Sequence, residues 1–152
     1  MILVDTSVWI THLRAADARL TALLDARQVL GHPFVTGEVA LGNLPRRDVV
    51  LSELRDLPQA AMATDEEVLD LIDRQALFGR GIGYIDAHLL AAVRLTADAK
   101  LWTGDRRLQR VAAELGLAAM LPTDRDRSGG RAALSSRKNS AGKNGALQWN
   151  VP

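Results

Sequence analysis

The sequence predicts an α/β fold, a three-layer α/β/α sandwich around a mainly parallel central sheet. Two observations predict it. Short apolar runs suited to buried strands alternate with longer segments of helical periodicity, and a chain of 152 residues has room for one such domain. With 47% hydrophobic and 24% charged residues, the composition is that of a globular protein. We therefore expect one packed core.

The first thirty residues predict a strand, two helices and a second extended piece. Residues 2–4 (Ile-Leu-Val) form an apolar run typical of a buried strand. Residues 5–7 (Asp-Thr-Ser) favour a helix N-cap, because their side-chain oxygens accept free backbone N–H groups, and a helix is expected over 8–14. A further helix is expected over about 19–26, and a short extended piece over 29–30.

The middle of the chain is expected to be mostly helical. Pro33 ends the extended piece and leads into a helix that carries Glu38. Residues 48–57 place their apolar side chains on one helical face, whereas 59–63 suggest a short strand. The segment 64–67 fits a capping box, in which the Thr and Glu side chains satisfy two free backbone donors, and it begins another helix.

The last predicted elements surround a glycine-rich loop at 79–83. Asp86 follows this loop at the head of an apolar helix. A strand is expected over 101–103 and a helix over 105–115, with Gly116 as its C-terminal stop. The glycines do not match a nucleotide-binding fingerprint, so we expect the loop to act as a hinge.

The chain divides into a domain at 1–121 and a basic segment at 122–152. The segment has six Lys or Arg and two Asp, a net charge of +4, whereas the domain has 13 Lys or Arg and 16 Asp or Glu, a net charge of −3. Because the segment lacks apolar periodicity, we expect a disordered tail. The weakly acidic domain means that any contacts with nucleic-acid phosphates would be local.

Absent features narrow the function classes. The chain has no cysteine, which excludes disulfides, thiolate metal sites and cysteine nucleophiles. No apolar run reaches the roughly 18–20 residues of a membrane span, and no signal peptide is recognisable. We therefore expect a cytoplasmic protein without a membrane partner.

Four carboxylates are candidates for one site. Asp5 and Asp105 each follow a predicted strand, and the sites of open parallel sheets lie outside the carboxyl ends of strands. Glu38 and Asp86 lie on or just before helices. Taken singly, each has an ordinary interpretation: Asp5 and Asp86 as caps, Asp105 as a turn residue, and Glu38 as a solvated glutamate. Asp98 is the substitute if Asp105 is not a ligand.

The surroundings of Asp5 and Asp86 favour a metal site over these ordinary roles. Both are flanked by apolar sequence, and a buried charge is costly unless it is paired or bound to a metal. Oxygen-only ligands suit Mg²⁺ or Mn²⁺. Such a site offers the activated water and Lewis acid that phosphodiester hydrolysis needs. The histidines His12, His32 and His88 are not expected to form a site.

Four segments of the chain resemble the PIN-domain family, especially its VapC-type toxin ribonucleases. They occur in the family's order and together span about residues 2–118. The segments are 4–10 (VDTSVWI), 32–42 (HPFVTGEVALG), 81–92 (GIGYIDAHLLAA) and 101–108 (LWTGDRRL).

The resemblance implies an endoribonuclease that acts as the toxin of a toxin–antitoxin pair and hydrolyses RNA with a metal-activated water. Its acidic, metal-binding and catalytic residues would be Asp5, Glu38, Asp86 and Asp105. Hydroxyls that orient carboxylates or water would come from Thr6, Ser7 and Thr103. The family also implies Mg²⁺ or Mn²⁺ as cofactor, single-stranded or loop RNA (often transfer RNA) as substrate, a homodimer, and a VapB-like antitoxin as inhibitor.

The sequence leaves alternatives for two arginines and for the function. Arg80 and Arg106 are candidates for contacts with RNA phosphates, against the alternative that each is a solvated surface arginine. The alternatives to an RNA-cutting toxin are a catalytically silent binding module with the PIN fold and a DNA-directed nuclease on the same fold.

Overall fold

The computed structural model describes residues 1–121, so the predicted tail at 122–152 lies outside the described residues. The strands are β1 (Ile2–Val4), β2 (Val29–Leu30) and β3 (Lys100–Trp102). The helices are α1 (Thr6–Arg14), α2 (Ala18–Asp25), α3 (Pro33–Ala40), α4 (Arg47–Asp56), α5 (Asp65–Arg74), α6 (Tyr84–Leu95) and α7 (Arg106–Glu114).

The sheet is parallel, as predicted, with the strand order β2-β1-β3. Leu3 at the centre of β1 pairs with Leu30 on one side and Leu101 on the other. Single parallel bridges extend each edge, from Gly31 to Gln59 and from Leu101 to Ala118. Since all the strands run in one direction, their carboxyl ends meet at one edge.

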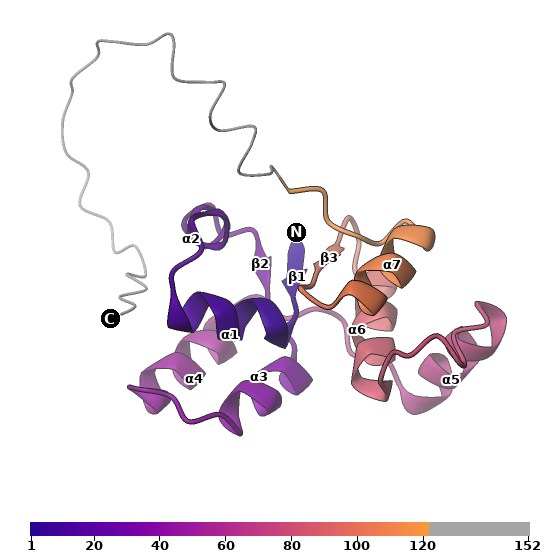
Figure 1. Ribbon diagram of the computed structural model, residues 1–152, viewed down its shortest axis with the longest axis horizontal. Helices are drawn as coiled ribbons and strands as arrows, with labels where there is room; N and C mark the ends of the chain where they lie inside the picture. The colour runs from indigo at the N-terminus through magenta and orange to yellow at the C-terminus, as the bar shows by residue number, and fades with distance from the viewer. Residues whose placement is uncertain (122–152) are drawn as a thin grey trace, which may run out of the picture.

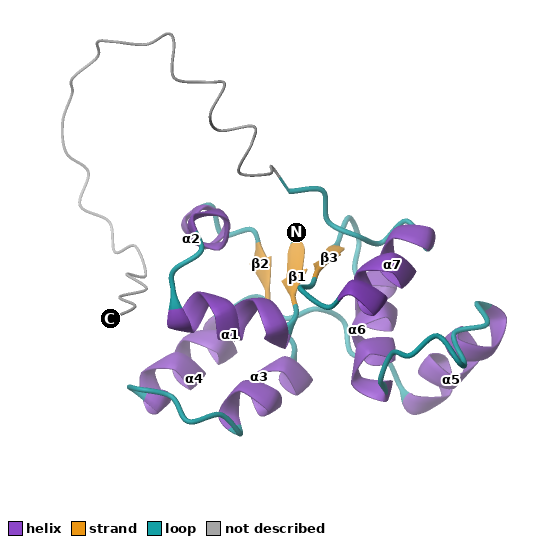
Figure 2. Cartoon of the chain, in the orientation of Figure 1, coloured by secondary structure: helices purple, strands orange, loops and turns teal. Residues whose placement is uncertain are grey.

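Helices flank the sheet on both sides, which is the predicted layered α/β arrangement. In Figures 1 and 2, α1 to α4 lie to the left of the strands and below them, whereas α5 to α7 lie to the right. The most buried helix is α6, in which every residue from Ala87 to Val93 is buried. Trp9 from α1 and Leu101 from β3 are fully buried in the same core.

One predicted strand is wrong. Residues 59–63 form no strand, and only Gln59 pairs with the sheet. The reason lies in the neighbouring segment: the Ala60 N–H still donates to the Gly31 carbonyl at 2.9 Å, but α3 begins at Pro33, which has no N–H to donate to a further rung. Beyond this bridge the Ala61 N–H donates to the hydroxyl of Thr96, just after α6, at 2.9 Å.

Two predicted helix boundaries are confirmed. The capping box at the start of α5 is complete: Thr64 Oγ1 accepts from the Glu67 N–H, and the Glu67 carboxylate accepts from the Thr64 N–H at 2.8 Å. After α7, Gly116 has φ +69°, the left-handed conformation that glycine adopts without a steric penalty. Asp105, expected inside this last helix, instead precedes it as the N-cap.

Candidate active site

The carboxyl ends of β1 and β3 bring two of the predicted acids together. Asp5 follows β1 directly, and its N–H donates to the carbonyl of Trp102, the last residue of β3, at 2.9 Å. From β1 the chain continues to β2 on one side of it, and only later to β3 on the other. The crevice where neighbouring connections diverge in this way is the usual place for a site in an open parallel sheet.

Asp5 is the most enclosed of the four acids, with 6% of its surface exposed. Its Oδ2 accepts hydrogen bonds from Ser7 Oγ at 2.6 Å and Thr103 Oγ1 at 2.8 Å. It occupies the N-cap position of α1, but its side chain makes no capping hydrogen bond. The ordinary capping interpretation therefore fails for Asp5, and two hydroxyls fix the orientation of its carboxylate.

Glu38 reaches the site from α3. Its Oε2 accepts a hydrogen bond of 2.5 Å from the hydroxyl of Thr6, at the start of α1. Thr6 and Ser7, adjacent in sequence, thus orient two different carboxylates. All three predicted orienting hydroxyls, including that of Thr103, donate to members of the predicted quartet.

Asp86 lies in the first turn of α6, and its Oδ2 accepts from the Gly83 N–H at 2.8 Å. This is half of a capping box, because Gly83 has no side chain to complete it. Burial raises the pKa of Asp86 above its ordinary value, and the negative charges of Asp5, Asp105 and Glu38 raise it further, while the Gly83 hydrogen bond opposes the shift. The four acids therefore share one electrostatic environment.

Asp105 has a structural task as well as a place in the site. It caps α7, with Oδ1 accepting from the N–H groups of Arg107 at 2.8 Å and Leu108 at 2.9 Å. Its own N–H donates to Thr103 Oγ1 at 3.0 Å. The ordinary interpretation of Asp105 was a turn residue, whereas the structure shows an N-cap in which Oδ2 takes no part.

One oxygen of each acid is left without a hydrogen-bond donor from the described part of the chain. The other oxygen of the same carboxylate accepts every hydrogen bond that the acid receives there. The oxygens that accept none are Asp5 Oδ1, Glu38 Oε1, Asp86 Oδ1 and Asp105 Oδ2. Within residues 1–121 no three Asp, Glu or His side chains stand close enough to form a ready-made metal cage.

Gly104 contributes to the site but was given no role from the sequence. Its N–H donates to Ser7 Oγ at 2.9 Å, and that hydroxyl donates in turn to Asp5. A Cβ atom at Gly104 would lie 3.3 Å from Ser7 Oγ, so a side chain there would press on this hydroxyl. The sequence feature that could have indicated this role is the position of Gly104 between two predicted site residues, Thr103 and Asp105.

The two predicted phosphate contacts differ in their surroundings. Arg80 forms an ion pair with Glu114 of α7, with Nη2 and Oε2 2.5 Å apart, so its charge is partly neutralised. Arg106 is exposed at the start of α7. Its neighbour Arg107, also exposed, lies across the glycine loop against Gly81.

Other titratable residues lie outside the quartet. Asp98 lies in the turn before β3, at the opposite end of that strand from Asp105, so it cannot replace it as a ligand. His12, His32 and His88 are at most 2% exposed and lie in the core. His88 contacts the rings of Phe34 and Tyr84, with centroids 4.8 and 4.6 Å apart.

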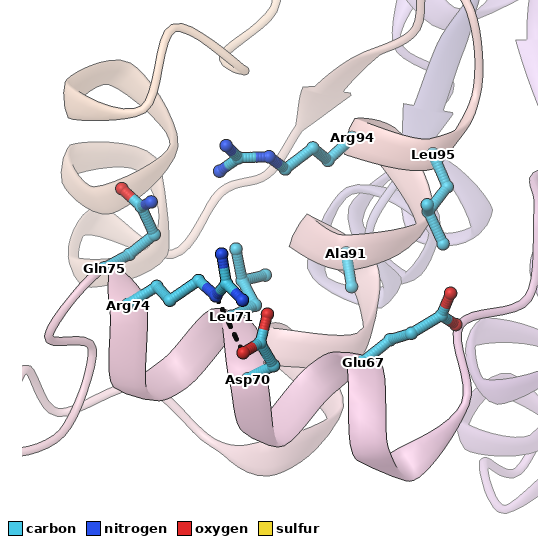
Figure 3. A pocket seen from close by; sticks show the side chains of 8 residues that line it. All are labelled: Glu67, Asp70, Leu71, Arg74, Gln75, Ala91, Arg94 and Leu95. Carbon is cyan, nitrogen blue, oxygen red and sulfur yellow. Dashed lines mark hydrogen bonds and ion pairs between the residues drawn. The ribbon is translucent and has the colours of Figure 1, made fainter.

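A separate hollow lies between α5 and the C-terminal half of α6 (Figure 3). Its polar lining includes Arg94 and the ion pair of Arg74 with Asp70, which are 2.7 Å apart. None of the four site carboxylates lines it. The candidate site is therefore the group of four acids near the carboxyl edge of the sheet.

Comparison with known proteins shows the family of the chain. The family model described as PIN domain matches residues 2–114. The chain belongs to the PIN-domain family. It is 54% identical over 118 residues to Ribonuclease VapC32 of Mycobacterium tuberculosis, in strain CDC 1551 / Oshkosh and equally in strain ATCC 25618 / H37Rv. The aligned region covers 78% of this chain and 95% of the relative in each case. The expected fold and the resemblance to VapC-type ribonucleases are confirmed. No described helix of this PIN-domain protein is long and apolar enough to cross a membrane.

Proposed function

We propose that this chain is a metal-dependent endoribonuclease of the VapC type, with Asp5, Glu38, Asp86 and Asp105 as its metal-binding and catalytic acids. The observation that carries the assignment of the acids is their shared arrangement. Each carboxylate is held through one oxygen and keeps the other without a donor from residues 1–121, and three of the acids raise the pKa of the fourth. PIN-family membership and the relative named as a ribonuclease support the activity.

The donor set fits Mg²⁺ or Mn²⁺. The available atoms of the four acids are carboxylate oxygens, which these hard cations prefer, and the chain has no cysteine to supply a thiolate. The lack of a ready-made three-ligand cage is compatible with Mg²⁺, which usually binds one or two carboxylates directly and keeps several water molecules. Mutual repulsion of the acids would favour an open arrangement until a cation offsets it.

The chain's own residues prepare the site for hydrolysis. When bound, the metal would lower the pKa of a water molecule and withdraw charge from the phosphoryl oxygens. Asp5 and Asp86 would hold the metal, while Glu38 and Asp105 would hold its water molecules or the attacking water. Thr6, Ser7 and Thr103 keep the carboxylates of Glu38 and Asp5 turned so that one oxygen of each stays available. Such partners typically change metal affinity or activity by about 10–100-fold.

The test is cleavage of RNA by the purified full chain. We expect cutting with Mg²⁺, loss of cutting with EDTA, and loss in Asp5→Asn and Asp86→Asn. Cleavage by both variants at the parent's rate would refute the assignment of the acids. Digestion of matched DNA beside the RNA tests the DNA-directed alternative, and calorimetric titration with Mn²⁺ tests the silent binding module, which would take up no metal at millimolar concentration.

The remaining expectations rest on family membership alone. They are transfer RNA as a substrate, inhibition by a VapB-like antitoxin and a homodimer, while a cytoplasmic location stays a prediction from the sequence. Phosphate contacts by Arg80 and Arg106 also stay predictions. Co-purification with the product of a neighbouring small reading frame, followed by loss of RNA cleavage in that complex, tests the antitoxin.

A further inference from the structure

Arg107 is an exposed arginine close to the acids of the site, and the proposed chemistry gives it no role. It lies in the first turn of α7, two residues after Asp105, whose Oδ1 accepts from its backbone N–H at 2.8 Å. Its side chain extends over the glycine loop. A Cβ atom at Gly81 would lie 3.0 Å from Cδ, 3.1 Å from Nη1 and 3.3 Å from Nε of Arg107.

This contact joins the two segments that carry acids of the site. Gly81 has φ +76°, a left-handed conformation that suits glycine, and Gly83, two residues later, donates its N–H to Asp86. The Arg107 side chain therefore lies between the loop that holds Asp86 and the helix that Asp105 caps. A side chain at position 81 would make the arginine shift by a few tenths of an ångström, so the glycine leaves room for its present position.

The charge of Arg107 is not neutralised by a close acid. Among residues 1–121, Arg19, Arg74 and Arg80 each form an ion pair with an aspartate or glutamate, whereas no carboxylate lies within ion-pair distance of Arg107. The residue is exposed as a whole. A guanidinium that is packed along its stem and unpaired at its head loses little side-chain entropy when it binds an anion.

We propose, on the basis of the proposed nuclease function, that Arg107 binds a backbone phosphate of single-stranded RNA next to the scissile one. Four carboxylates repel a polyanion, so a substrate needs a cation beside them to approach. Arginine suits this task because its planar fork of N–H donors matches a phosphate in two-point contact. Arg80, although near in sequence to Gly81, already has Glu114 as its partner.

The test measures RNA binding in the Asp5→Asn background, where the RNA stays intact. The probe is a short fluorescent single-stranded RNA, and its anisotropy is followed at several NaCl concentrations. We expect Arg107→Gln to raise Kd about tenfold, as for the loss of a charge-assisted hydrogen bond. The slope of log Kd against log salt should fall by about 0.7, the value for one phosphate contact on a single strand.

Two further variants make the result specific. Arg107→Lys keeps the charge, so it should keep the salt slope while losing part of the affinity. Arg110→Gln removes an exposed arginine one turn further along the same helix and should bind as the parent does. Equal Kd and equal slope for Arg107→Gln and Arg110→Gln would overturn the inference, as would a larger effect of Arg106→Gln than of Arg107→Gln. If the parent neither binds nor cuts RNA, the proposed function fails as well.

Discussion

The hydroxyl of Thr103 donates to Oδ2 of Asp5 at 2.8 Å, across 98 positions of sequence, and both residues are 6% exposed. The same hydroxyl accepts the N–H of Asp105 at 3.0 Å. One buried oxygen therefore connects the acid that follows β1 with the acid that follows β3. The position of one carboxylate relative to the other depends on this link, because the two strands end at the same edge of the sheet.

Replacing Thr103 with valine should damage both stability and activity. Valine has nearly the shape of threonine but lacks the hydroxyl, so Asp5 loses a donor and the Asp105 N–H loses its acceptor. We expect the free energy of unfolding to fall by about 1–3 kcal/mol and RNA cleavage to fall by about 10–100-fold. Urea unfolding and cleavage rates measure the two effects. Thr103→Ser, which keeps the hydroxyl, is the control, and valine with the parent's cleavage rate would contradict the argument.

Asp5→Asn should separate activity from folding. The amide oxygen can still accept hydrogen bonds from Ser7 and Thr103, while the negative charge that opposes ionisation of Asp86 is removed. We expect RNA cleavage to fall by at least about a hundredfold, with no loss in the free energy of unfolding measured without metal. Asp73→Asn, on an exposed part of α5, is the matched control and should cleave normally. If Asp5→Asn were destabilised enough for unfolding to account for the lost cleavage, Asp5 would have a structural role instead.

Mg²⁺ should stabilise the parent against heat and leave Asp5→Asn nearly unaffected. A ligand that binds only the folded state stabilises it by an amount set by its concentration over its Kd, about 2.7 kcal/mol at a hundredfold excess. Differential scanning calorimetry with and without Mg²⁺ gives the shift in Tm. Equal shifts in the parent and the variant would place the cation elsewhere on the protein.

The sequence was sufficient to predict most of the fold. Apolar runs in the strands and periodic helices predicted the parallel α/β arrangement, and the capping box at Thr64 was correct to the residue because both of its partners are local. The predicted strand at 59–63 failed because its non-local partner, the segment after Gly31, turns into α3 at Pro33 and offers no further rung. Propensity within a short window contains no information on such a partner.

The site was predictable in its residue types but not in its contacts. Order along the chain and the family resemblance pointed to four acids and three hydroxyls, and the structure shows which hydroxyl serves which acid. Sequence spacing could not show that Arg80 is paired with Glu114 while Arg107 is free of ion pairs within residues 1–121, since both outcomes depend on how α7 packs against the glycine loop. Side-chain direction over a loop requires the tertiary structure.

Asp86 should make the metal-free protein less stable as the pH rises. Burial, and then the charges of the other three acids, raise its pKa in the folded state above the ordinary value of about 3.9. The folded state then holds the proton more tightly, so the free energy of unfolding falls as pH rises from about 4 through the folded-state pKa. In EDTA at pH 7, Asp86→Asn should be more stable than the parent, with the excess shrinking toward pH 4. Parallel stability curves for the two proteins would refute this.

His32 should have the opposite effect over a neighbouring pH range. It is fully buried, and burial together with the nearby His88 lowers its pKa to about 4. The unfolded chain, with a histidine pKa of about 6.5, then binds the extra proton more readily, so stability is complete above about pH 6.5 and is lost as the pH falls toward 4. Since His32 Nδ1 accepts the Phe34 N–H at 3.1 Å, asparagine can replace it as the cap of α3.

His32→Asn should therefore flatten the acid limb of the stability curve. The comparison is best made in the Asp86→Asn background, because the two residues change stability in opposite directions between about pH 4 and 6.5. We expect the histidine protein to lose about 2–3 kcal/mol more than the asparagine protein over that range, from a pKa difference of about 2.5 units. Asparagine leaves a small cavity that lowers stability at every pH, so the slope of unfolding free energy against pH is the measurement. Equal slopes would show that the pKa of His32 is the same in the folded and the unfolded protein.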